Sequence, residues 1–112
     1  MFTGHGDGYV RIGETDYRDN LLVMPDRLIE GWAPGGFDAL SESDFAELAA
    51  LRPEVALFGS GAAMRFPHPR LTRALAEAGI GIEVMDTPAA CRTYNILAAE
   101  GRRVAAAILV GG

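Results

Sequence analysis

The sequence predicts a single α/β domain, residues 1–112, with three layers in which N-terminal β-hairpins pack with a mostly parallel βαβαβ sheet. Two observations support this fold class. The first third of the chain contains short apolar segments separated by turn residues, whereas the second half alternates short apolar runs with helical patterns. In addition, 49% of the residues are hydrophobic, so one core can form without a disulfide or a metal ion.

Two hairpins are expected first. Gly13-Glu14 fits a type II′ turn, and in the resulting register Arg11 lies opposite Asp16 as an oppositely charged pair. The second hairpin spans residues 21–29 around a Pro25-Asp26 turn, because proline supplies the φ angle that this turn requires. An irregular connection is expected to follow it.

The second half of the chain predicts helices that alternate with short buried strands. Ser41 and Asp44 have the spacing of a capping box, and Pro53 ends the helix that they begin. Later helices are expected to begin after Pro69 and at Thr87, which we predict to be an N-cap. Buried strands are expected at residues 55–58, 82–85 and 104–110. Their short links imply parallel neighbours joined by right-handed crossovers.

This topology also predicts where a ligand or partner would bind. The strand ends at Gly59 and Met85 meet at one edge of the sheet, and open α/β sheets bind ligands at such carboxyl edges. Backbone N–H groups of a glycine loop and of a helix start can converge there on an anion. The predicted pocket consists of Gly59, Ser60, Gly61, Asp86, Thr87, Cys91, Arg92, Thr93 and Asn95.

Each candidate residue has a structural alternative. The Gly59-Ser60-Gly61 loop lacks the third glycine of a dinucleotide fingerprint, so no cofactor is expected. Cys91 is either a nucleophile activated by the helix start or a small buried hydrophobic residue. Arg92 is either a clamp for a carboxylate or a partner's acidic side chain, or a solvated arginine. Trp32 is either a partner-facing anchor or a lid on the core.

Charge and composition argue against several classes of function. The net charge of −5 argues against binding of nucleic acid or of an anionic membrane surface. One cysteine and two distant histidines argue against a metal cluster and exclude an internal disulfide. No apolar run has the length of a membrane span, and the N-terminus does not resemble a signal peptide. We therefore expect a cytoplasmic bacterial protein without direct membrane insertion.

Several segments, in consistent order, resemble a known family. They are Leu21–Arg27, Phe58–Gly61 with Arg65–Pro67, Gly79–Thr87 with Cys91–Leu97, and Ala99–Ala106. The family is a small uncharacterised α/β domain family of bacteria and archaea, and its eukaryotic members include a mitochondrial respiratory complex I assembly factor. The resemblance spans Ile12 to Val110. It implies a β-rich N-terminal part packed against a mixed sheet that has one antiparallel strand.

The resemblance also bears on function, because this family has no established catalytic residues. Its recurring residues lie in the glycine loop and the strand–helix corner, here Gly59, Gly61, Asp86, Thr87, Arg92, Thr93, Tyr94 and Asn95. We therefore expect a non-enzymatic protein-interaction or assembly-factor-like module that binds an unidentified protein partner through the carboxyl edge of its sheet and Trp32.

Two other functions remain open. One is a small-molecule (carboxylate or phosphate) binding protein or weak enzyme, with its pocket between the Gly59–Gly61 loop and the Thr87–Asn95 helix start. The other is a structural subunit that oligomerises through an edge strand. The sequence leaves the oligomeric state open.

Overall fold

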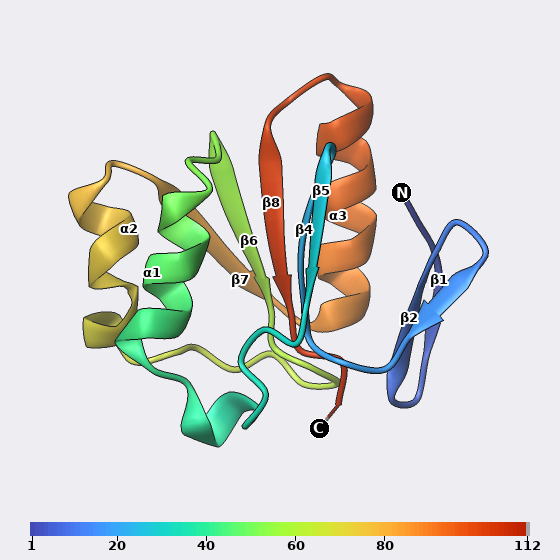
Figure 1. Ribbon diagram of the computed structural model, residues 1–112, viewed down its shortest axis with the longest axis horizontal. Coiled ribbons are helices and arrows are strands. Elements are labelled where there is room, and N and C mark those ends of the chain that lie inside the picture. Colours follow the sequence, from blue (N-terminus) through green and yellow to red (C-terminus); the bar gives the residue numbers. More distant parts are fainter. Residues whose placement is uncertain (112) are drawn as a thin grey trace.

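The computed structural model, which describes residues 1–111, contains two β-sheets and three α-helices (Figure 1). The strands are β1 Phe2–Gly6, β2 Tyr9–Ile12, β3 Thr15–Tyr17, β4 Leu21–Met24, β5 Arg27–Glu30, β6 Val55–Gly59, β7 Gly81–Met85 and β8 Val104–Ile108. The α-helices are α1 Glu42–Ala50, α2 Arg73–Glu77 and α3 Thr87–Ala99, and short 3-10 helices span Phe37–Ala39 and Pro69–Thr72.

The main sheet has five strands in the order β5-β4-β8-β6-β7. Strands β6, β7 and β8 are parallel neighbours, as the short strand–helix links predict. Strand β4 pairs antiparallel with both β5 and β8, so it alone runs against the other four strands. The second hairpin is therefore part of the main sheet, and the expectation of one antiparallel strand is confirmed.

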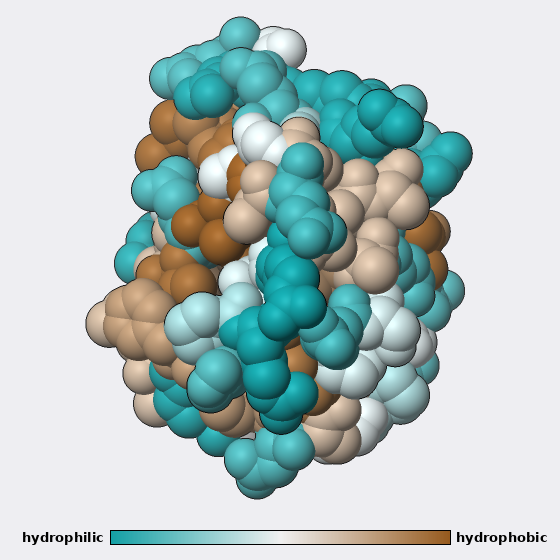
Figure 2. All heavy atoms as spheres, turned by 90° about the vertical axis from the view of Figure 1, so that its left-hand side faces the viewer, coloured by the Kyte–Doolittle hydropathy of each residue, from teal (hydrophilic) through white to brown (hydrophobic). Residues whose placement is uncertain are grey.

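Helices cover both faces of this sheet and produce the predicted three layers. On one face, α1 and α2 bury Phe45, Leu48 and Leu75 against the strands. On the other face, α3 buries Ala90 and Tyr94. The outward surface of α1 and α2 is largely hydrophilic, with apolar atoms gathered along one side (Figure 2). The domain therefore contains two apolar layers separated by the sheet.

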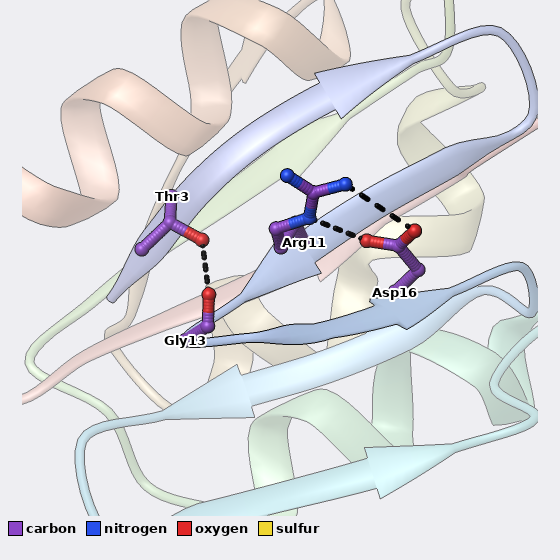
Figure 3. Close-up of polar contacts among 4 residues, drawn as sticks. All are labelled: Thr3, Arg11, Gly13 and Asp16. Carbon is purple, nitrogen blue, oxygen red and sulfur yellow. Dashed lines mark hydrogen bonds and ion pairs between the residues drawn. The ribbon is translucent and has the colours of Figure 1, made fainter.

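The small sheet β1-β2-β3 confirms the predicted register of the first hairpin. Arg11 pairs with Asp16, and their Nε and Oδ1 atoms lie 2.6 Å apart (Figure 3). Gly13 has a φ of 60°, as the first central position of a type II′ turn requires. The Thr3 hydroxyl donates to the Gly13 carbonyl at 2.6 Å and so joins β1 to this turn (Figure 3).

Helix α1 confirms the predicted capping box. The Asp44 N–H donates to Ser41 Oγ at 3.3 Å, and the Ser41 N–H donates to Asp44 Oδ2 at 3.0 Å. These reciprocal bonds give two backbone donors at the start of the helix side-chain acceptors. The same helix start lies next to Trp32, because the Asp44 carbonyl accepts a hydrogen bond from the indole Nε1 at 2.9 Å.

Candidate functional site

The glycine loop and the start of α3 meet at the carboxyl edge of the sheet, as the parallel topology predicts. This edge is the lower end of β6 and β8 in Figure 1. The Ser60 N–H donates to the Met85 carbonyl at 2.9 Å, and the Thr87 N–H donates to the Gly61 carbonyl at 2.8 Å. Residues about 25 positions apart in sequence are thus joined directly by backbone hydrogen bonds.

Asp86, and not Thr87, caps helix α3, so the prediction of Thr87 as the N-cap is wrong. Asp86 has extended backbone angles, and its Oδ1 accepts the Ala89 N–H at 2.8 Å. Both residue types are good caps, and the choice between them depends on which residue leaves the strand. Asp86 leaves it, and Pro88 therefore occupies the second helical position.

The Thr87 hydroxyl instead joins three segments of the fold. It donates to the Leu109 carbonyl at 2.6 Å and accepts the Gly61 N–H at 2.9 Å. We call this junction of the Gly61 loop, the residues after β8 and the start of α3 the Thr87 joint. Gly59 is part of it, because a Cβ atom at this position would be 3.0 Å from both Ala90 Cβ and Thr87 Oγ1. A glycine at this position therefore lets α3 approach β6 closely. The N–H groups of Ser60, Gly61 and Thr87 are all engaged inside this joint.

Cys91 has the environment of a core residue. Its side chain is buried among the apolar residues between α3 and the sheet. This burial raises the pKa of the thiol to about 12, although the positive charge of Arg92 acts in the opposite direction. A thiol with this pKa is protonated at neutral pH, and only the thiolate is nucleophilic. The structure thus favours the interpretation of Cys91 as a buried hydrophobic residue.

The other polar residues of α3 do not converge on one pocket. Arg92 is exposed and Thr93 is half-buried. Asn95 binds the backbone of β1, because its Oδ1 accepts the Phe2 N–H at 2.8 Å and its Nδ2 donates to the Phe2 carbonyl at 2.7 Å. Asn95 therefore attaches the small sheet to α3, while Arg92 remains available on the surface.

The prediction that Trp32 faces a partner is wrong. Only 2% of this side chain is exposed, and its ring contacts the rings of Phe45 and Phe58 edge-on, with centroids 5.8 and 6.3 Å away. The indole N–H is satisfied by the Asp44 carbonyl. Trp32 is therefore part of the core beneath α1, which is the alternative that its Gly/Pro-rich surroundings left open.

Beside this hydrogen-bonded joint lies a cleft that the sequence did not reveal. It has a volume of about 430 Å³ and is bordered by residues 18–20 before β4, by residues 34–38, by Arg65 and by Gly111. Arg65 lies over Phe37, with its Cζ 4.3 Å from the ring centroid, and its Nη2 donates to the Ser60 carbonyl at 3.3 Å. The run Arg65-Phe66-Pro67 is one of the segments that resemble the family, but it does not by itself indicate a cleft, because the cleft also depends on distant segments.

The loop that carries Arg65 also exposes two large apolar side chains. Met64 is 56% exposed and Phe66 is 67% exposed. The Ser60 hydroxyl fixes this loop, because it donates to the Ala63 carbonyl at 2.7 Å and accepts the Arg65 N–H at 2.9 Å. The carboxyl edge therefore has two parts, a hydrogen-bonded joint at Thr87 and an apolar loop beside the cleft.

Two features of residues 1–111 bear on the predicted classes of function. No helix in this part of the chain is long and apolar enough to cross a membrane. Within the same residues, no three histidine, cysteine, aspartate or glutamate side chains come together as a metal site would need.

Comparisons with known proteins confirm the resemblance seen in the sequence. The profile of a family described as proteins of unknown function, DUF498/DUF598, matches residues 2–109. An uncharacterised protein of Rhodobacter capsulatus is 38% identical over 108 residues, which cover 95% of this chain and 81% of that protein.

A second relative is a protein with an assembly function in its name. The NADH dehydrogenase (ubiquinone) 1 alpha subcomplex assembly factor 3 of Mus musculus is 33% identical over 90 residues, which cover 79% of this chain and 48% of the mouse protein. The chain thus spans about half the length of the assembly-factor relatives that it matches.

A solved structure supports the fold. The crystal structure of a protein from Bordetella parapertussis matches with a TM-score of 0.90 and 37% identity, covering 98% of this chain and 94% of that one. The three-layer arrangement with its mixed sheet is therefore shared with a protein of known structure.

Proposed function

The chain belongs to the DUF498/DUF598 family of proteins of unknown function, and from that membership we propose that it is a non-enzymatic protein-interaction module that binds its partner through the carboxyl edge of its sheet. Similarity to an NADH dehydrogenase assembly factor supports an assembly-factor-like role, because it covers 79% of the domain. The partner of this chain need not be the one that the mouse name indicates, since about half of that relative lies outside the matched region.

The exposed pair Met64 and Phe66 is the observation that carries this proposal. Single exposed apolar residues are common on protein surfaces, but these two lie in one short loop at the predicted edge. Hydrogen bonds to Ser60 hold the loop in place, so little conformational entropy would be lost when a partner binds. Aromatic side chains supply a large share of the binding energy in many interfaces.

The chemistry of the neighbouring joint supports binding over catalysis. The hydroxyls of Ser60 and Thr87 and the carboxylate of Asp86 hold backbone groups in place, and the Cys91 thiol has a raised pKa. These groups stabilise the edge that presents the loop. Arg92, exposed on the second turn of α3, remains our predicted charged contact for an acidic partner side chain.

A pull-down from lysate of the source cells tests the proposal with two matched variants. Phe66→Ser removes the apolar anchor, whereas Ile96→Ser removes a similarly exposed apolar side chain, 61% exposed, from the middle of α3. We expect wild type and Ile96→Ser to capture the same protein and Phe66→Ser to lose it, with folding of each variant checked by circular dichroism. Capture that survives Phe66→Ser but not Ile96→Ser would place the interaction elsewhere.

A further inference from the structure

We propose that the cleft beside Arg65 binds a small organic carboxylate that carries a single negative charge. This inference goes beyond the protein-interaction role and does not depend on it. The cleft lies at the carboxyl edge, between the segment that precedes β4 and the loop that follows β6. Its volume of about 430 Å³ falls within the range of small-molecule sites, roughly 300–1,000 Å³.

Arg65 is held in an orientation that leaves one end of its guanidinium group free. The ring of Phe37 fixes the plane of the group, and the Ser60 carbonyl takes one hydrogen of Nη2. Nε is buried and has no hydrogen-bond partner within residues 1–111, and Nη1 makes no hydrogen bond to these residues either. Nη1 and Nη2 at this end can donate two parallel hydrogen bonds to one carboxylate, because Nη2 carries a second hydrogen.

The charge of Arg65 lacks a counterion among residues 1–111. Within residues 1–111, no carboxylate oxygen lies within 4.0 Å of the guanidinium nitrogens of Arg65 or of Arg18, the second arginine at the cleft. The Phe37 ring and the Ser60 carbonyl offset only part of the hydration that this half-buried cation has lost, since its Nε has no partner among residues 1–111. An anion bound at the Nη1–Nη2 end would neutralise the charge of this cation and offset part of that cost.

The remaining charges of the cleft select the class of anion. Asp19 and Asp38 also border it, and neither forms an ion pair with Arg18 or Arg65. These two carboxylates repel every negative charge that a ligand carries, whereas the free end of Arg65 can pair with only one carboxylate. Each further charge on the ligand therefore adds repulsion without that pairing. The cleft is therefore matched to a monocarboxylate, and phosphate and tricarboxylates are disfavoured.

Titration of ¹⁵N-labelled protein, followed by NMR, tests this assignment with acetate, lactate and pyruvate as monocarboxylates and with citrate and inorganic phosphate as competitors. We expect saturable shifts for at least one monocarboxylate at the amides of Gly35, Gly36 and Phe37 and at the Arg65 Nε–H. Arg65→Gln should weaken this binding at least tenfold. Arg70→Gln, the same change at an exposed arginine that does not border the cleft, should leave it unchanged.

A second variant keeps Arg65, so that a folding defect of Arg65→Gln cannot be mistaken for a loss of binding. Asp38→Asn removes one negative charge from the border of the cleft and should tighten monocarboxylate binding severalfold. The proposal is overturned if no monocarboxylate gives a saturable shift, or if Arg70→Gln weakens binding as much as Arg65→Gln. Tighter binding of phosphate or citrate than of every monocarboxylate would overturn the ligand class.

Discussion

The carboxyl edge of the sheet contains two neighbouring regions with opposite hydrogen-bonding status. At Thr87, the side-chain and backbone groups that the sequence pattern predicts to bind a ligand form hydrogen bonds with each other. At Arg65, in the loop that follows β6, a guanidinium group retains unpaired nitrogens and two apolar side chains face solvent. A cluster of polar residues at a helix start therefore does not identify a binding site until its internal partners have been counted.

If the groups at Thr87 are paired as described, the largest loss of stability is expected for Thr87→Val, which keeps the shape of the side chain and removes the hydroxyl. The Leu109 carbonyl and the Gly61 N–H would both lose their buried partner. We expect the free energy of unfolding, measured by urea denaturation, to fall by about 3 kcal/mol.

Thr93→Val is the matched control on the same helix, since the Thr93 side chain makes no hydrogen bond within residues 1–111. It should change the free energy of unfolding by no more than about 0.5 kcal/mol. Equal losses for the two valine variants would mean that the Thr87 joint does not hold the edge together.

A smaller loss is expected for Gly59→Ala. The new Cβ would lie 3.0 Å from Ala90 Cβ, so α3 would have to move away from β6. Overpacking of this kind costs about 1–3 kcal/mol, measurable as a lower urea midpoint. Gly81→Ala is the control, because a Cβ at that position meets no atom within 4 Å. A Gly59→Ala variant as stable as Gly81→Ala would contradict the close contact between α3 and β6.

The smallest effect on stability is expected for Cys91, and it is confined to alkaline pH. Burial raises the pKa of its thiol from 9.0 to about 12, so the folded state holds a proton that the unfolded state releases above pH 9. This contribution to stability is complete below pH 9 and is lost as the pH rises toward 12. Wild type should therefore lose stability more steeply than Cys91→Ala over that range, as followed by denaturant titrations at several pH values. Parallel profiles for the two proteins would contradict burial of the thiol.

Local signals predicted much of this fold. The Gly13-Glu14 turn, the Ser41 capping box and the parallel order of β6, β7 and β8 depend on residues close in sequence or on short links. Strand β1 was not predicted, because its sequence is rich in glycine. It is held to α3 by contacts of Phe2 with Tyr94 and Asn95, more than 90 residues away.

Non-local contacts also explain the limits of the site prediction. The residues of the glycine loop and the α3 corner were correctly placed at one edge, but their hydrogen bonds to each other could not be read from the sequence. The residues around Trp32 in the sequence are typical of an exposed loop. Trp32 is nevertheless buried, because its ring packs against Phe45 and Phe58. The cleft at Arg65 combines four separate segments of the chain, so no single motif encodes it.

Photo-cross-linking in the source cells tests most directly whether the loop beside the cleft is the interaction surface. A photoreactive benzoyl-phenylalanine would replace Phe66 in one variant and Ile96, similarly exposed on α3, in the other. Our account predicts a specific protein adduct from position 66 and none from position 96. An adduct from position 96 alone, or from neither position, would contradict it.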